Sequence, residues 1–143
     1  MKKTSQEDQF KLDKQLCFPL YISSRRIINL YSPYLRPLGL TYTQYLVMLV
    51  LWDQKEVTVG DLCRTLYLEH GTVTPMLKKM ETAGLLNRSR DVSDERIVRV
   101  TLTPKGSALQ EDCKDLPNKI SETVTLTDEQ ATTLRELLDI ILR

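Results

Sequence analysis

The stretch that decides the fold is GTVTPMLKKMETAGLLNRSRDVSDERIVRVTLTPKG, residues 71–106, because the period of its apolar residues changes along its length. Up to Gly84 the period is helical, and beyond it Val98, Val100 and Leu102 alternate with polar residues. We therefore expect Gly84 to cap a helix and the polar segment DVSDE to form the tip of a β-hairpin. A helix followed directly by such a hairpin is typical of the second half of a winged helix-turn-helix.

The helix that ends at Gly84 has a predictable orientation. The residues expected to face inward are Met76, Leu77, Met80 and Ala83. Lys78, Lys79 and Thr82 are expected to face solvent. Pro75 has no N–H to donate to a preceding turn, so it is expected in the first turn of this helix.

The segments before residue 70 supply the other helices of the module. Thr58 and Asp61 have the spacing of a capping box and open a short helix. Thr41 and Gln44 form another such pair, and residues 45–52 after them are apolar almost all round, as in a helix buried on several sides. The winged helix-turn-helix is thus expected to span residues 42–103.

A long amphipathic helix is expected before this module. It carries apolar residues on one face, and the segment YSPYLRPLGL, which contains two prolines and a glycine, is expected to break it. Pro19 lies in this helix, where it would introduce a kink or mark a new start beside Cys17.

Two further helices are expected after the module. Pro104 and Gly106 start one that runs to about Leu116, and Thr127 with Gln130 caps the last. The last helix has an apolar stripe formed by Leu134, Leu137, Leu138 and Ile141. A monomer would expose this stripe, so residues 10–38 and 104–143 are expected to form a homodimer. The predicted fold is mainly α with a small β-hairpin wing, in one domain of residues 1–143.

Composition narrows the function classes. The chain has 20 basic and 19 acidic residues, so no global basic field indicates nucleic acid. The first nine residues lack an apolar core and no apolar run could span a bilayer, so we expect neither a signal peptide nor a membrane partner. The cysteines Cys17, Cys63 and Cys113 show no CxxC spacing, which favours a reducing cytoplasm over a disulfide scaffold or zinc site. Cys63 is expected in the core, and Cys113 exposed or at an interface.

Enzyme hypotheses find little support. The sequence has one histidine and no P-loop, HExxH or Gly-x-Ser-x-Gly motif, and it predicts no cofactor and no metal. A cysteine thiol peroxidase remains conceivable from Cys17 alone, but it would leave the winged-helix pattern without a purpose.

Basic residues gather locally despite the balanced total. From Lys78 to Lys105 there are seven basic and four acidic residues, and six of the basic ones lie on the predicted second helix and wing. They would neutralise phosphates, although most charge clusters are simply solvated surface. The helix-then-hairpin order favours nucleic acid.

Three segments together resemble the MarR family of dimeric winged-helix repressors. They are TYTQYLVMLVLW, YLEHGTVTPMLKKMETAGL and RSRDVSDERIVRVTLTPKG. LCFPLY, LTYTQYL and GTVTPMLKKM narrow the resemblance to the OhrR subgroup of organic hydroperoxide sensors, of the one-cysteine type. The resemblance covers residues 12–117.

The resemblance implies a DNA-binding set. The residues that would begin the recognition helix in the major groove are Gly71, Thr72, Thr74, Pro75 and Lys78, with His70 and Lys79 beside them. Arg96 would reach the minor groove, and Asp94 would orient wing arginines such as Arg88. At His70 relatives usually carry a small hydroxyl residue, so this side chain would either replace that contact or merely be exposed.

The resemblance also implies a redox-sensing set. Cys17 would be the peroxide-reactive thiol, with Tyr21 near it on the same helix and Tyr31 and Tyr42 reaching it from the partner subunit. Tyrosines at helical spacing are more often core residues, and apolar neighbours raise a thiol pKa, so a structural role for Cys17 is the alternative.

The predicted function is a cytoplasmic, homodimeric repressor of an inverted-repeat operator that organic hydroperoxides and a small-molecule thiol inactivate through Cys17. One alternative is a MarR-type regulator of a small aromatic ligand or another oxidant, without Cys17 chemistry. The other is the thiol peroxidase.

Overall fold

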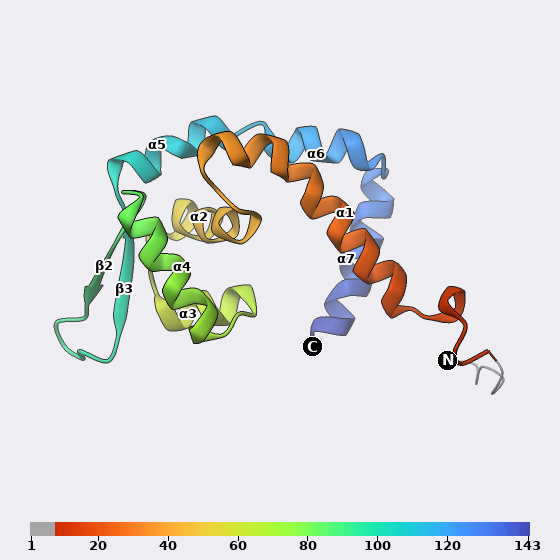
Figure 1. The fold of residues 1–143 in the computed structure, drawn as a ribbon, viewed down its shortest axis with the longest axis horizontal. Coiled ribbons are helices and arrows are strands. Elements are labelled where there is room, and N and C mark those ends of the chain that lie inside the picture. The colour runs from red at the N-terminus through yellow and green to blue at the C-terminus, as the bar shows by residue number, and fades with distance from the viewer. Residues whose placement is uncertain (1–7) are drawn as a thin grey trace. The chain divides into compact units, whose positions relative to one another are not determined.

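The computed structural model describes residues 8–143 (Figure 1). They form two compact units. One consists of residues 32–115, and the other of residues 116–143 with the described part of residues 1–31. Each unit is described by itself.

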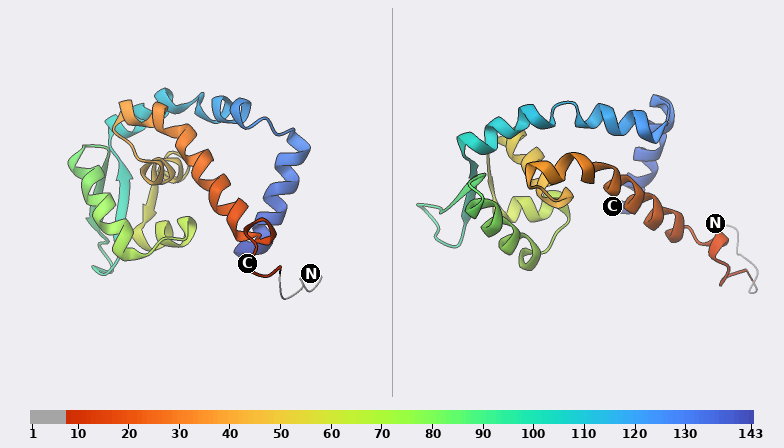
Figure 2. Two further views of the ribbon diagram at one scale, coloured as in Figure 1. Left: turned by 45° about the vertical axis from the view of Figure 1, so that its right-hand side comes forward. Right: turned by 45° about the horizontal axis from the view of Figure 1, so that its top comes forward.

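The unit of residues 32–115 is a winged helix. Its elements are the end of α1 (Cys17–Leu35), η2 (Arg36–Leu38), α2 (Tyr42–Gln54), β1 (Glu56–Thr58), α3 (Val59–Leu66), α4 (His70–Thr82), β2 (Leu86–Arg90), β3 (Val98–Leu102) and α5 (Pro104–Cys113). The helix α4 and the hairpin that follows it lie side by side, as both views of Figure 2 show. The predicted fold class is confirmed.

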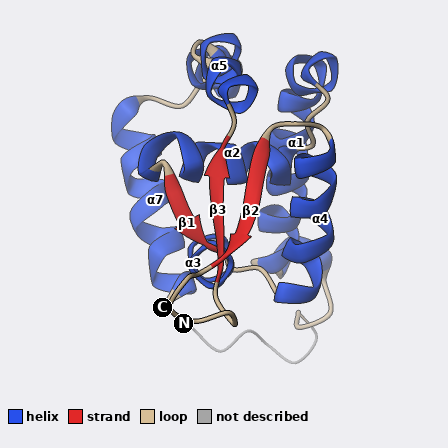
Figure 3. Ribbon diagram, turned by 90° about the vertical axis from the view of Figure 1, so that its left-hand side faces the viewer, coloured by secondary structure: helices blue, strands red, loops and turns tan. Residues whose placement is uncertain are grey.

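The strands of this unit form an antiparallel sheet in the order β1-β3-β2 (Figure 3). Val57 of β1 and Arg88 of β2 both pair with Val100, which is fully buried in the central strand. The sequence predicted the hairpin but not β1. A three-residue strand has too few positions to display an alternating pattern, and β3 recruits it through long-range pairing.

Local capping fixes the helix starts. Thr41 and Gln44 make the full capping box at α2, with N–H···O distances of 3.3 and 3.0 Å. At α3 the Thr58 hydroxyl accepts from the Asp61 N–H at 3.1 Å but donates to the Asp61 carboxylate at 2.7 Å. The predicted capping box of Thr58 and Asp61 is therefore only half formed. The Asp61 carboxylate accepts from the Thr58 hydroxyl and not from the Thr58 backbone N–H, as a full box would require.

The core of this unit packs helices against one face of the sheet. The largest fully buried side chains are Leu35, Val47, Met48, Leu51, Leu62, Val73, Leu77, Met80, Leu86 and Val100. Each large apolar side chain removed from water contributes about 1.5–3 kcal/mol, so α4 is held mainly by its apolar stripe.

A junction at residues 103–106 ties α4 to α2 and α5. The Thr103 hydroxyl accepts from the Gly106 N–H at 3.0 Å and donates to the Gly84 carbonyl at 2.6 Å. The Lys105 ammonium donates to the Ala83 carbonyl at 2.9 Å, and the buried Trp52 indole donates to the Gly106 carbonyl at 2.9 Å. The junction thus satisfies carbonyls that the end of α4 leaves without helical partners.

Several predictions about α4 need correction. The Thr72 and Val73 amides both donate to the Glu69 carbonyl, so the helix begins at His70 and Pro75 lies inside it rather than in its first turn. Pro75 has no N–H to donate to the Gly71 carbonyl, so α4 lacks one intrahelical hydrogen bond at this point. Ala83 is also exposed, since the helix has already ended. Gly84 confirms the predicted C-cap with φ +78° and the Schellman bond from the Leu85 N–H to the Met80 carbonyl, 3.0 Å.

The other unit contains η1 (Leu12–Lys14), most of α1, α6 (Leu116–Val124) and α7 (Asp128–Leu142). Pro19 is the third residue of α1, so it marks a new start and not a kink. Pro33 does not break α1, which ends at Leu35. The change of direction comes at Gly39, with φ +72°.

Two helices were predicted after the module, and the structure has a third between them, α6, whose Leu116 and Ile120 are buried one turn apart. α7 starts at the predicted capping box of Thr127 and Gln130. Leu134, Leu137 and Ile141 are exposed, as expected for the stripe of a lone chain. No helix within residues 8–143 is long and apolar enough to cross a membrane.

Gly106→Ala is expected to destabilise the protein by about 3 kcal/mol or more, at the upper end of overpacking costs. A Cβ there would lie 2.0 Å from the Leu85 carbonyl oxygen, and this neighbour is backbone. Urea denaturation followed by circular dichroism measures the change. Gly71→Ala is the matched control, because a Cβ there meets nothing within 4 Å, and it should be neutral or slightly stabilising. Equal stabilities of the two variants would contradict the role of the junction.

Candidate DNA-binding face and reactive thiol

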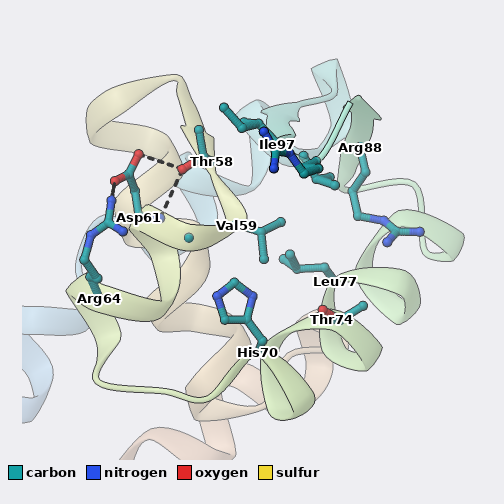
Figure 4. Close-up of a pocket in the computed structure, with 12 residues that line it drawn as sticks. Thr58, Val59, Asp61, Arg64, His70, Thr74, Leu77, Arg88 and Ile97 are labelled. Carbon is teal, nitrogen blue, oxygen red and sulfur yellow. Dashed lines mark hydrogen bonds and ion pairs between the residues drawn. The ribbon is translucent and has the colours of Figure 1, made fainter. Parts of the chain in front are cut away.

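A hollow of about 510 Å³ lies between α3, α4 and the wing (Figure 4). His70 and Thr74 line it from α4, Arg64 from α3, and Arg88 and Arg96 from the wing. The His70 imidazole points into the space below Val59. We call these five lining residues and the exposed side of α4 the candidate DNA-binding face.

The predicted recognition residues share one side of α4. Gly71, Thr72, Pro75, Lys78 and Lys79 are all exposed, and Thr74 is half-buried. The helix buries Val73, Leu77 and Met80 on the opposite side. The apolar period that anchors the helix therefore also sets which polar residues can meet a ligand.

Arg88 is held on α4 rather than on the wing tip. Its N–H and its Nε donate to the two carboxylate oxygens of Glu81, both at 3.0 Å. These hydrogen bonds lower the pKa of Glu81, and the one from the Arg88 backbone N–H has the largest effect. The prediction that Asp94 orients Arg88 is therefore wrong, because Glu81 lies on the helix against which β2 packs.

Asp94 instead holds Arg96. Its Oδ1 accepts from the Arg96 N–H at 3.0 Å and from Nε at 3.1 Å. The Arg96 side chain is 92% exposed. Its NH2 also donates to Asp94 Oδ2 at 3.4 Å, so one edge of the guanidinium pairs with Asp94 while the side chain stays open to solvent. An exposed arginine that is oriented in this way fits a narrow groove of negative potential.

Arg64 was missed by the sequence analysis. It follows Asp61 by one turn of α3, and the two side chains form an ion pair beside the Asp61–Thr58 hydrogen bond. The Thr58 hydroxyl and Arg64 lower the pKa of Asp61. The i, i+3 spacing of Asp61 and Arg64 is the sequence pattern that could have revealed this pair.

Cys17 is the first residue of α1 and is exposed. The free amides of a helix start offer hydrogen bonds to an anion, and no acidic residue lies in this first turn. Tyr21 follows one turn later, and its hydroxyl accepts from Arg25 at 3.2 Å. The Arg25 guanidinium also lies 5.5 Å from the centre of the Tyr21 ring.

The two other predicted tyrosines do not adjoin Cys17 on its own helix. Tyr31 lies fourteen residues further along α1, which corresponds to about 21 Å of helix. Tyr42 begins α2, in the other unit, and burial raises its pKa.

The remaining cysteines are shielded. Cys63 is buried, as predicted, but Cys113 is also buried, which corrects the expectation that it is exposed or interfacial. Cys113 lies in the last turn of α5, and its charged sequence neighbours point elsewhere on the helix. Burial raises the pKa of both thiols. Among the described residues, Cys17 is thus the exposed cysteine.

A winged helix with a basic, exposed recognition surface defines a DNA-binding transcriptional regulator, and comparisons with known proteins agree. Residues 29–113 match the family model described as transcriptional regulator SarA/Rot. The organic hydroperoxide resistance transcriptional regulator of Bacillus subtilis is 48% identical over 113 residues, 79% of this chain and 77% of that protein. The chain belongs to this family of winged-helix transcriptional regulators.

Solved structures match over nearly the whole chain. Reduced AbfR bound to DNA is 38% identical with a TM-score of 0.79, over 94% of this chain and 95% of that one. A mutant MarR from E. coli complexed with operator DNA is 28% identical with a TM-score of 0.81, over 95% and 99%. The predicted resemblance to MarR-type regulators is confirmed.

Acid is expected to destabilise the DNA-binding unit. The folded state lowers the pKa of Glu81 below its value of about 4.3 in the unfolded chain. Its contribution to stability is therefore complete above about pH 5 and is lost as the pH falls through the lower, folded pKa.

Urea unfolding between pH 6 and 3 measures this loss. Glu81→Gln should lower stability at pH 6 and flatten its decline, whereas Glu122→Gln, on the exposed side of α6, is the control. Identical pH profiles for Glu81→Gln and the unsubstituted protein would count against the Glu81–Arg88 pair.

Proposed function

We propose that this protein is a homodimeric, cytoplasmic repressor that binds an inverted-repeat operator and releases it when an organic hydroperoxide oxidises Cys17. The observation that carries the proposal is the contrast between the cysteines: Cys17 is exposed at a helix start, whereas Cys63 and Cys113 are buried with raised pKa values. Of these three cysteines, Cys17 is the one that an oxidant in solution can reach.

The candidate DNA-binding face supports the DNA half of the proposal. The exposed side of α4 would enter the major groove, with Lys78 and Lys79 close to phosphates. Arg96 would enter the adjacent minor groove. The relatives AbfR and MarR have both been solved on DNA.

The exposed apolar residues of α7 support a homodimer. Leu134, Leu137 and Ile141 on α7 leave a stripe that a second copy would bury. Two-fold symmetry would then present two recognition helices to half-sites about one turn of DNA apart. We place the dimer contacts in residues 10–38 and 104–143, and the DNA contacts in residues 42–103.

The chemistry at Cys17 is a two-electron oxidation. The thiolate attacks the terminal peroxide oxygen, an S–O bond forms and the O–O bond breaks. The hydroperoxide leaves as an alcohol after taking a proton, and the sulfur becomes a sulfenic acid. A small thiol then displaces the hydroxyl as water and leaves a mixed disulfide.

The mixed disulfide is the form we expect to release DNA. AbfR has been solved overoxidised and bound to DNA, and also in a disulfide-formed state. Here Cys63 and Cys113 are buried, so neither is accessible to resolve Cys17 without unfolding. A bulky adduct at Cys17 would crowd the partner's Tyr31 and Tyr42, and packed interfaces respond to such crowding by switching arrangement.

Cys17→Ser should bind operator DNA normally and remain bound after cumene hydroperoxide and glutathione are added. Fluorescence anisotropy follows release, and intact-mass analysis identifies the adduct. Cys113→Ala is the matched control and should release DNA like the unsubstituted protein, because its thiol is buried. Release by Cys17→Ser would support a regulator without Cys17 chemistry, and many turnovers per protein would support a peroxidase.

Arg96→Ala should weaken operator binding by about 1–3 kcal/mol, because it removes the exposed wing guanidinium. Lys105→Ala is the control, since this ammonium is held on the Ala83 carbonyl and lies outside the wing tip. Anisotropy titrations with operator and scrambled duplexes at moderate salt measure the effect. Equal affinity of the unsubstituted protein for both duplexes would reject a specific repressor.

A further inference from the structure

We propose that Asp91 and Arg99 are positioning residues that set the wing arginine Arg96 for the minor groove. This inference rests on the proposed DNA-binding function. It concerns two residues that the sequence analysis did not assign, and it explains why a carboxylate lies buried at the base of the wing tip.

Asp91 is 8% exposed and is the buried charged residue of the described chain. Its Oδ1 accepts from the Ser93 N–H at 2.8 Å and from the Asp94 N–H at 3.2 Å, and also from the Ser93 hydroxyl. Its Oδ2 accepts from Arg99 Nε. A carboxylate that receives two successive backbone N–H groups fixes the turn that contains them.

The turn that Asp91 fixes positions Asp94, and Asp94 in turn binds Arg96. Backbone hydrogen bonds close the same loop, from the Asp91 N–H to the Ile97 carbonyl at 2.8 Å and from the Ile97 N–H to the Asp94 carbonyl at 2.9 Å. Arg96 thus has no direct contact with Asp91 among the described interactions, but its anchor Asp94 is set by Asp91.

Arg99 connects this tip to the body of the module. It lies in the central strand β3, opposite Thr58 of β1 and Ser89 of β2. Its NH1 donates to the Glu56 carboxylate of β1 at 2.8 Å while Nε holds Asp91. One planar guanidinium therefore couples the wing tip to the strand that leads directly into α3.

Charge gives Arg99 a second role at the wing. A buried carboxylate close to DNA would repel phosphate. The ion pair with Arg99 neutralises the negative charge of Asp91. Without Arg99, Asp91 would be a buried charge with no cationic partner, and the turn would be expected to reorganise.

The test is a double-mutant cycle on operator affinity in the full-length protein. Asp91→Ala, Arg96→Ala and the double variant are titrated against a fluorescent operator duplex. We expect each single variant to lose about tenfold in affinity and the double variant to lose no more than Arg96→Ala alone, because Asp91 acts through Arg96. Losses that multiply in the double variant would overturn the inference.

Two further measurements separate positioning from stability. Exchanging A·T for G·C pairs under the wing should weaken binding of the unsubstituted protein, but not of Asp91→Ala or Arg96→Ala. Asp91→Asn keeps an oxygen for the Ser93 and Asp94 amides, so it should recover much of the affinity. If Asp91→Ala does not fold, Arg99→Gln takes its place in the same cycle, with the same two outcomes.

The same titrations distinguish a failure of the proposed DNA-binding function from a failure of the positioning role. If Arg96→Ala bound the operator like the unsubstituted protein, the wing contact itself would be wrong. If Arg96→Ala weakened binding as expected but its free-energy loss added to that of Asp91→Ala in the double variant, only the positioning role would be rejected. Arg90→Ala, which removes a wing arginine bound to the Glu95 carbonyl, controls for the loss of one positive charge.

Discussion

The close packing of Gly106 against the Leu85 carbonyl is the constraint on which the winged-helix unit depends. Trp52 holds the Gly106 carbonyl from α2, and Thr103 satisfies both the Gly106 amide and the Gly84 carbonyl. The end of α4 is thereby fixed to α2 and to α5. Because the contact is backbone against backbone, it leaves no room for a side chain and little room for α4 to tilt independently.

The module separates two kinds of surface on the same short elements. α4 buries Val73, Leu77 and Met80 and leaves its lysines free, while Arg88 is held by Glu81 and Arg99 by Asp91 and Glu56. These paired arginines shape the wing, and Arg96 at its tip pairs with Asp94 but stays exposed to solvent. A chain with almost no net charge can therefore still present a local excess of basic residues, because seven basic and four acidic residues lie between Lys78 and Lys105.

Burial also separates the cysteines into two buried thiols and one exposed thiol. Cys63 and Cys113 fill apolar space, where desolvation disfavours the thiolate, whereas Cys17 stands at the exposed start of α1. Tyr21, one turn after Cys17, contacts the Arg25 guanidinium through both its ring and its hydroxyl. The proposed sensor therefore requires no special residue type beyond one thiol, only its placement at a helix start.

The sequence by itself determined the helices before the hairpin, the hairpin, the Gly84 cap and the capping boxes of α2 and α7, because these depend on neighbours within a few residues. It also identified which side of α4 is apolar and which of its polar residues are exposed, since the helical period fixes this division. It missed the helix α6. Tertiary structure decided the rest. The strand β1, the burial of Cys113 and the partners of Arg88 and Arg99 depend on groups that are distant in sequence, as with Glu56 and Arg99. Local patterns carry no information about such pairs, because only packing brings them together.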